Sequence, residues 1–397
     1  MITIAQALEI VKRESYILDE ESVSLSEIVG RILAQDILAD MDVPPFNRSQ
    51  MDGFAVRSKD TEKTPARLRI VGESVAGRGW HNEMEAGQAV RIMTGASVPT
   101  GADAVQKVEL TEESDGFVTI QEPTKIGQNI VAKAEEISRG EKIFRCGEIV
   151  TENMIASLAS FGYSTIEVSK RPRVKILATG SEIVDISETP GQDQIRNSNS
   201  WMLNALASRY ADVEILPIAI DDLNGLKQTI SGAAKTTDCL IISGGVSVGD
   251  YDFTKPALRE LGAVVYFERV SLKPGKPTVF AKLNETLVFG LPGNPVSTAI
   301  TFFVFVRKAL LNMQGAKETG LKKGSAKLTH EIRGVKGRDS LLPVSLSTSK
   351  KGKLLIETLR FSGSSNYIRF AKADALVFVR EGEVLKKGDT ARIYFLP

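Results

Sequence analysis

The sequence contains little cysteine and little histidine, and it has no long uninterrupted apolar run. Its 397 residues include two cysteines, Cys146 and Cys239, and two histidines. Cys239 falls in an apolar segment that reads as a buried strand, so we expect no disulfide framework and a cytoplasmic protein. His81 and His330 stand alone in the sequence. They offer no zinc-type spacing and little for a Ser-His-Asp triad to use.

Charge and hydropathy exclude further classes of protein. The formal net charge is +1, so no global field attracts the chain to nucleic acid or to a membrane. The longest apolar stretch, around 299–306, is far short of the roughly 20 residues that a membrane span needs. The first helical segment mixes polar and charged residues with apolar ones, which is not typical of a signal peptide. With 42% apolar and 25% charged residues, the chain reads as a globular protein of two to four domains.

The order of periodic segments and turn signals divides the chain into regions of different secondary structure. Residues 1–43 are predicted to be helical, because Thr3 with Gln6 and Ser24 with Glu27 match the capping-box pattern. Short strands separated by glycine and proline follow, then a mixed segment, then alternating strands and helices that are typical of a parallel sheet. The end of the chain returns to strands and predicts a small barrel. These signals predict a small β-rich domain (44–138), a mixed segment (139–171), an α/β domain (172–314) and a C-terminal β-barrel domain (315–397).

Three loops of the predicted α/β domain could hold an anion. SGGVSVGD (243–250) follows a strong strand, and its glycines allow backbone N–H groups to surround a ligand, although a plain tight turn is an equal alternative. It matches neither the dinucleotide nor the Walker pattern. LPGNPVS (291–297) places Asn294 and Pro295 at a helix start, which is both a good cap and an anion site. KPGKP (273–277) presents two lysines on a stiff bend, although exposed lysines near turns are common.

Acidic residues follow the strands of the same predicted sheet. They are Glu182, Asp221, Asp222, Asp250 and Asp252. Such sheets bind ligands beyond the carboxyl ends of their strands, on the rim where the lysine loop is expected. Carboxylates beside phosphate-binding loops indicate magnesium, but Asp221 and Asp222 could equally cap a helix.

Six motifs, in order, resemble a known family. PPFNRSQMDGFAV, RIMTGASVPTGADAV, LATGSEI, IISGGVSVGDYDF, KPGKP and LPGNPVS span positions 44 to 297. They are similar to the successive signatures of the molybdopterin molybdenumtransferases, the MoeA/gephyrin family, and the β-rich tail fits the C-terminal domain of that family. Two positions depart from the family pattern: Glu135-Glu136 stands where the family often has Glu-Asp, and Ser181 stands where relatives have an acid or an amide.

The resemblance implies both the fold and the reaction. It implies four domains, in which residues 1–43 and 139–171 together form one helical linker domain. It also implies that the α/β domain is a MogA-like molybdopterin-binding domain, and that the chain forms an elongated homodimer. The active cleft would lie between the α/β domain of one subunit and the small β domain of the other. The implied transferase takes adenylylated molybdopterin and molybdate, releases AMP and forms molybdenum cofactor with Mg²⁺. The resemblance further implies contacts with other proteins of molybdenum cofactor biosynthesis.

The motif positions give the expected site residues. Residues tied to catalysis are Asp52, Thr94, Glu182, Asp221 and Asp252, and those expected to hold the metal are Glu182, Asp221, Asp222 and Asp252. Residues expected to bind the substrate are Ser243, Gly244, Gly245, Ser247, Gly249, Lys273, Gly275, Lys276, Pro292, Gly293, Asn294 and Pro295. Residues expected to hold molybdate are Lys273, Lys276, Ser297, Arg338 and Ser364.

Two other functions compete with this one. The first is adenylylation of molybdopterin, which a related α/β domain performs, but the linker and the barrel argue against it. The second is a scaffold, a role that gephyrin also has in animals. Scaffolding there uses a long linker and an extra domain, and neither is found in this sequence.

Overall fold

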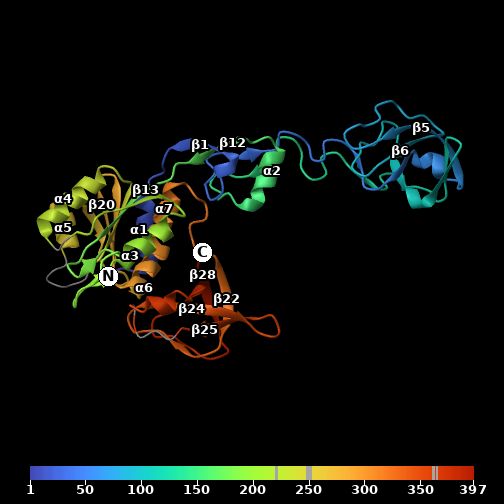
Figure 1. Cartoon of the computed structure of the whole chain (residues 1–397). Coiled ribbons are helices and arrows are strands. Elements are labelled where there is room, and N and C mark those ends of the chain that lie inside the picture. The colour runs from blue at the N-terminus through green and yellow to red at the C-terminus, as the bar shows by residue number, and fades with distance from the viewer. Residues whose placement is uncertain (220–221, 247–252, 360–362, 364) are drawn as a thin grey trace. The chain divides into compact units, whose positions relative to one another are not determined.

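The computed structural model describes residues 1–219, 222–246, 253–359, 363 and 365–397 (Figure 1). Its internal contacts divide the chain into two compact units. Unit 1 consists of Met1–Gln35, Cys146–Asn153 and Thr165–Pro397, and unit 2 consists of Asp36–Arg145 and Met154–Ser164. Each unit is described by itself below.

A mixed β-sheet forms the α/β part of unit 1. Its strands are β13 (Arg173–Ala178), β16 (Asp212–Ile215), β17 (Cys239–Ser243), β18 (Val264–Phe267), β20 (Val279–Leu283) and β21 (Thr286–Leu291). They lie in the order β16-β13-β17-β21-β20-β18. The strands from β16 to β21 run parallel, as the sequence predicts. An antiparallel edge made by β20 and β18, which the alternating pattern does not predict, extends the sheet.

Helices cover both faces of this sheet (Figure 1). One face carries α4 (Leu223–Ala234) and α5 (Thr254–Glu260), and the other carries α1 (Ile4–Glu14), α3 (Ser198–Ala207), α6 (Pro295–Thr301) and α7 (Arg307–Met313). Strand β17 explains this arrangement, because Ile241 belongs to the core under α3 while Leu240 and Ile242 belong to the core under α4. Successive side chains of a strand point to opposite faces.

The segment Pro295–Met313 is a continuous helix, with a π-helical stretch at Phe302–Val306 between α6 and α7. It extends beyond the apolar stretch at 299–306 that the sequence singles out. Within the described part of the chain, this helix of 19 residues is long and apolar enough to cross a membrane, yet 83% of its apolar window is buried. That burial is typical of the core helix of a soluble protein.

The N-terminal segment departs from the predicted helix after residue 14. Thr3 and Gln6 do form the predicted capping box at the start of α1. Residues 20–24, however, form strand β1 (Glu20–Ser24), which pairs antiparallel with β12 (Thr165–Ser169). Ser24 caps only a short 3₁₀ turn, Leu25–Glu27. The prediction of helix across 1–43 is therefore wrong beyond α1, because pairing with a strand distant in the sequence outweighs a local capping signal.

Unit 2 contains the predicted small β-rich part. Its main sheet has the order β7-β4-β6-β5-β9-β8. The strands are β4 (Gly53–Val56), β5 (Ala66–Ser74), β6 (Gln88–Ile92), β7 (Ala104–Lys107), β8 (Thr111–Ser114) and β9 (Phe117–Ile120). Two short antiparallel pairs accompany it: β2 (Ile37–Leu38) with β11 (Lys142–Phe144), and β3 (Arg48–Ser49) with β10 (Ile130–Val131). The helix α2 (Ile155–Ser160) belongs to the same unit.

The C-terminal strands close into the predicted barrel. They are β22 (Lys323–Leu328), β24 (Asp339–Thr348), β25 (Leu354–Thr358), β26 (Ala375–Val379) and β28 (Thr390–Phe395). Pairing runs β24-β25-β22-β28-β26 and returns from β26 to β24. A short strand, β19 (Leu272–Lys273), adds to the barrel in parallel with β24. This pairing brings the lysine loop of the α/β part against the barrel.

Candidate active site

The carboxyl ends of β13, β17 and β21 border a cavity of about 880 Å³, called the first cavity below. Thr179 follows β13, Ser243 and Gly244 lie at the end of β17, and Pro292 follows β21; all of them line it. The residues predicted to bind substrate at 243–245 and 292–295 are therefore brought together. Ser247 and Gly249 lie outside the described residues.

The glycines of the loop after β17 are required by close packing. Gly244 and Gly245 have φ angles of +101° and +61°, where glycine is favoured. A Cβ on Gly244 would lie 2.5 Å from the carbonyl oxygen of Thr179, and one on Gly245 would lie 2.7 Å from Oγ1 of Thr254. The loop is thus fitted closely between β13 and α5, and its backbone borders the first cavity.

The helix start at 294–295 differs in one detail from the prediction. Pro295 occupies the first turn of α6, as predicted. Asn294 stands at the N-cap position, but its side chain makes no capping hydrogen bond. Its carbonyl oxygen instead accepts from Thr298, from the backbone nitrogen at 3.0 Å and from Oγ1 at 3.0 Å. Asn294 thus occupies the predicted N-cap position, but without a capping hydrogen bond from its side chain.

A second cavity of about 520 Å³ adjoins the first. Residues predicted to hold molybdate line it: Lys273, Lys276, Ser297 and Arg338, together with Gly275. Three residues, Pro277, Pro292 and Asn294, line both cavities. Ser364 lies outside the described residues, although its neighbour Gly363 lines the second cavity.

The pairing of β19 with β24 explains how these cations meet. Lys273 lies opposite Ser340, two residues after Arg338. Gly275 has a φ of +119°, and a Cβ there would lie 2.6 Å from the side chain of Thr301. Among the described residues, no acid lines the second cavity and none forms an ion pair with Lys273, Lys276 or Arg338. A cavity with several uncompensated cations favours an anionic guest.

The predicted metal ligands are only partly brought together. Glu182 lines the first cavity and is the one acid among its described lining residues. Asp222 lines neither cavity; it caps α4, and its Oδ2 accepts from the backbone nitrogen of Gly225 at 2.6 Å. Asp221, Asp250 and Asp252 lie outside the described residues. The described part of the chain contains no cluster of three His, Cys, Asp or Glu side chains suited to a metal ion.

Asp52 and Thr94, both in unit 2, are brought into direct contact. Oδ1 of Asp52 accepts from the backbone nitrogen of Thr94 at 2.6 Å and from Thr94 Oγ1 at 2.7 Å. These hydrogen bonds hold the pKa of Asp52 below its usual value, and the one from the Thr94 hydroxyl has the larger effect. Glycine must follow Asp52, because a Cβ on Gly53 would lie 1.9 Å from the carbonyl oxygen of Gln106.

Two acids noted as a departure from the family pattern also lie in unit 2. Oε2 of Glu135 accepts from the backbone nitrogen of Ala132 at 2.9 Å. Glu136 lies 3.5 Å from Arg48, and 59% of its side chain is exposed. Glu135 therefore has a backbone hydrogen bond as its contact, and Glu136 has an ion pair with Arg48.

Sequence reasoning missed several residues of the first cavity. Thr179, Arg196, Asn197 and Asn199 line it, and none of them is among the site residues expected from the sequence. Among the described lining residues, Arg196 is the one cation. The signal was the run Asn-Ser-Asn-Ser directly before an apolar helix, because polar residues at a helix start in this kind of sheet lie at its ligand-binding edge.

Comparison with known proteins covers nearly the whole chain. Residues 2–162 match the model of the MoeA N-terminal region (domain I and II), residues 175–312 match that of a probable molybdopterin binding domain, and residues 325–396 match that of the MoeA C-terminal region (domain IV). The molybdopterin molybdenumtransferase of Staphylococcus aureus (strain MSSA476) is 33% identical over 398 residues, covering 99% of this chain and 95% of that protein. That of Staphylococcus epidermidis (strain ATCC 12228) is 32% identical over 386 residues, covering 96% and 92%.

Solved structures agree with this relationship. A molybdopterin biosynthesis MoeA protein from Pyrococcus horikoshii shares 31% identity, with a TM-score of 0.82 and coverage of 100% of this chain and 99% of that one. A second structure of a MoeA protein from Pyrococcus horikoshii OT3 has a TM-score of 0.86 at 28% identity and covers all of both chains. The chain therefore belongs to the MoeA family of molybdopterin molybdenumtransferases, which are transferases of molybdenum cofactor biosynthesis.

Proposed function

We propose that this chain transfers molybdenum from molybdate to adenylylated molybdopterin and releases AMP, with magnesium as the metal. Membership of the family makes the chain a transferase that inserts molybdenum into molybdopterin. The finer points, namely the adenylylated form of the substrate, the metal and the residue roles, are the proposal.

One observation carries the proposal: two cavities of different character share a wall. The first cavity is bordered by a glycine loop and has one described cation and one described acid, Arg196 and Glu182. The second is lined by Lys273, Lys276 and Arg338 and by no described acid. A substrate with a large heterocyclic part and a compact dianion as its co-substrate fits such a pair of neighbouring sites.

In this proposal the second cavity, lined by Lys273, Lys276 and Arg338, holds molybdate. Lys273 and Lys276 stand on a bend that contains Pro274 and Pro277, so they lose little freedom on binding. Arg338 adds a planar group that can donate two hydrogen bonds to an oxyanion. Ser297 adds a hydroxyl donor from the first turns of α6. Positive groups fixed in advance lower the cost of placing a dianion beside substrate phosphates.

The first cavity would hold the pterin substrate and its phosphates. The backbone around Gly244 and Gly245 can donate N–H groups to phosphate oxygens. Glu182 fits a magnesium site, because Mg²⁺ binds through one or two carboxylates and completes its shell with substrate phosphates and water. When bound there, the ion would polarise the phosphate bridge. Asp221, Asp222 and Asp252 remain proposed ligands of the same ion.

Asp52 and Thr94 are proposed to act in the cleft of a homodimer, as the family resemblance implies. Their hydrogen bonds keep Asp52 ionised and fix its orientation. An ionised carboxylate held in this way can accept a proton or orient a substrate hydroxyl group. We further propose a cytoplasmic location, in line with the finding that Cys146 and Cys239 form no disulfide with each other.

The direct test uses the purified chain with adenylylated molybdopterin, molybdate and magnesium. We expect release of AMP and formation of a cofactor that activates an apo-molybdoenzyme. If the chain instead converts molybdopterin and ATP into adenylylated molybdopterin, it catalyses the competing adenylylation step. Rescue of a deletion strain by the wild-type gene but not by the Lys276→Ala gene would separate a catalyst from a scaffold.

A further inference from the structure

Two side-chain oxygens beside the glycine loop have no hydrogen-bond partner among the residues that the structure describes. They are Oγ1 of Thr179 and Oδ1 of Asn199. Both residues line the first cavity, one at the end of β13 and the other in the first turn of α3. Thr179 is only 5% exposed. A buried polar atom without a partner is costly, so such atoms at a cavity wall point to a ligand that would satisfy them.

The orientation of the Asn199 amide follows from its neighbours. Nδ2 lies 2.9 Å from Oγ of Ser243 and 2.6 Å from the carbonyl oxygen of Gly293. A carbonyl oxygen can only accept, so the nitrogen must face Gly293 and Oδ1 must be the atom that remains unpaired. Asn199 thereby connects α3 to the end of β17 and to the loop before α6, and these bonds hold its Oδ1 in place.

The position of Thr179 is equally constrained. Its backbone nitrogen donates to the carbonyl oxygen of Ser243 at 3.0 Å. Its Oγ1 lies so close to the glycine loop that a Cβ on Gly245 would come within 2.9 Å of it. The hydroxyl therefore lies beside the loop, and Thr179 lines the first cavity together with Asn199.

We propose that Thr179 and Asn199 recognise the N–H edge of an amino-substituted heterocycle bound in the first cavity. This inference rests on the proposed function and adds two binding residues to it. An amide oxygen repels phosphate oxygens and accepts from N–H donors. The Asn199 oxygen therefore accepts from the ring of the ligand, and the backbone N–H groups of the glycine loop remain available for its phosphates. Both heterocycles of an adenylylated pterin, the pterin and the adenine, carry an exocyclic amino group.

The test is Thr179→Val, which replaces the hydroxyl with a methyl group of similar size. Affinities for pterin (2-amino-4-oxopteridine) and for AMP are measured by calorimetry on the full chain. We expect the variant to bind one of these probes about 3- to 10-fold more weakly, the range for one neutral hydrogen bond. Lumazine and inosine monophosphate, which lack the amino group, should bind wild type and variant alike. Thr179→Ser, which keeps the hydroxyl, should restore the affinity.

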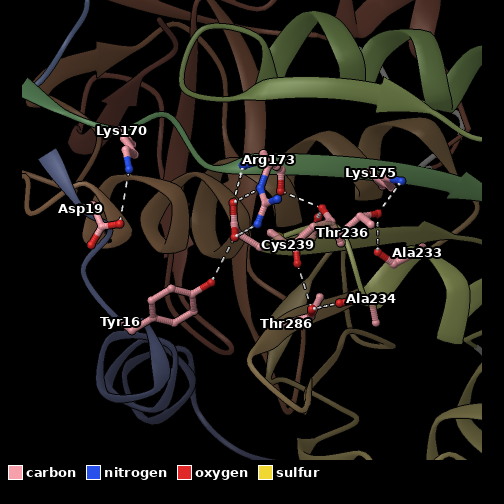
Figure 2. Close-up of polar contacts among 12 residues, drawn as sticks. Tyr16, Asp19, Lys170, Arg173, Lys175, Ala233, Ala234, Thr236, Cys239 and Thr286 are labelled. Atoms are coloured by element: carbon pink, nitrogen blue, oxygen red, sulfur yellow. Dashed lines mark hydrogen bonds and ion pairs between the residues drawn. The ribbon is translucent and has the colours of Figure 1, made fainter. Parts of the chain in front are cut away.

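Thr286→Val is the matched control. Thr286 is also buried, at 2% exposure, but its Oγ1 donates to the carbonyl oxygens of Ala234 (2.8 Å) and Thr237 (2.9 Å) (Figure 2). It lines neither cavity. This variant should lower the melting temperature and leave both affinities unchanged. Thr179→Val should behave in the opposite way, with a melting temperature equal to or above that of wild type, because it removes an unpaired buried hydroxyl.

The possible outcomes separate the two candidate rings. Weaker binding of pterin alone assigns the pair to the pterin ring, and weaker binding of AMP alone assigns it to adenine; either supports the inference. An unchanged affinity for both probes in Thr179→Val overturns it, as does a wild-type chain that binds neither. Molybdenum insertion by the wild-type chain is assayed in parallel, so that failure of the inference is distinguished from failure of the proposed function.

Discussion

One carboxylate oxygen of Asp52 accepts two hydrogen bonds from a single residue, Thr94, through its backbone nitrogen at 2.6 Å and its hydroxyl at 2.7 Å. The two residues are 42 positions apart in the sequence. They come together because one stands before β4 and the other after β6, and these strands pair with Gly53 opposite Ile92. The motif that contains Asp52 and the motif that contains Thr94 are thus in direct contact, although they are separate in the sequence.

This contact predicts that Thr94→Val raises the pKa of Asp52. The hydroxyl is the largest cause of the lowered pKa, and the backbone hydrogen bond remains in the variant. In the wild type, the stabilisation from the ionised Asp52 is present above its unfolded pKa and is lost as the pH falls through its folded pKa. The variant should therefore protonate Asp52 at higher pH, which ¹³C NMR titration of the carboxyl carbon measures. Thr94→Ser keeps a hydroxyl and should titrate like wild type.

The cations that line the second cavity predict that Lys276→Ala weakens the binding of molybdate. Loss of one fixed cation should weaken molybdate binding and slow molybdenum insertion, on the order of 100-fold in rate. The wild-type affinity for molybdate should fall as salt is added, and the variant should show a weaker salt dependence. Isothermal titration with molybdate and a turnover assay provide the two measurements.

Lys227→Ala is the control for this prediction. Lys227 forms an ion pair with Glu260 at 2.8 Å, between α4 and α5, and lines neither cavity. Its removal lowers the net charge by the same amount as Lys276→Ala. Equal losses in the two variants would show that overall charge, rather than the lysine loop, governs the binding of molybdate.

Much of this site could be predicted from the sequence because its parts are local. Gly244, Gly275 and Pro295 mark turns and a helix start whose chemistry is readable in a few residues. The partners of these turns could not be read in the same way. Residues 20–24 form a strand because a segment near 165 pairs with them, and Asn199 reaches the cavity because α3 begins beside β17. Such contacts depend on the tertiary fold, which no local pattern specifies.

A metal role for Glu182 predicts that Glu182→Gln raises the magnesium requirement. The amide keeps the shape of the side chain but loses the charge that a hard cation needs, so half-maximal activity should require on the order of tenfold more Mg²⁺. Magnesium titration of the turnover rate gives the measurement. An unchanged requirement would remove Glu182 from the proposed metal site.

Asp222 allows its two possible roles to be separated. As the N-cap of α4 it should be replaceable by asparagine, which caps equally well, whereas Asp222→Ala should cost about 1 kcal/mol of stability. As a metal ligand it should not tolerate asparagine, since the charge is lost. If Asp222→Asn has a normal melting temperature but needs more magnesium, Asp222 is a metal ligand. If both the melting temperature and the magnesium requirement are normal, Asp222 acts only as the helix cap.

The polar network at the opposite end of the sheet predicts a stability effect without loss of ligand binding. Asp238 accepts from the backbone nitrogen of Arg173 (2.8 Å), from its guanidinium (2.9 and 3.1 Å) and from the hydroxyl of Tyr16 (3.3 Å) (Figure 2). Burial alone would raise the pKa of Asp238, but the hydrogen bonds and the charge of Arg173 outweigh it, and the pKa is lowered. The network thus joins the segment after α1 to the start of β13.

Asp238→Asn should therefore lower stability at neutral pH by about 2 kcal/mol, because a charge-assisted pair with Arg173 is replaced by a neutral one. Since the folded pKa is lowered, the contribution of Asp238 is present above its unfolded pKa and is lost as the pH falls through the folded value. The difference in melting temperature between wild type and variant should consequently shrink on going from pH 7 to acidic pH. Tyr16→Phe removes one long hydrogen bond and should cost less, about 0.5 to 1 kcal/mol. A difference that stays constant with pH would contradict the role assigned to the ionised carboxylate.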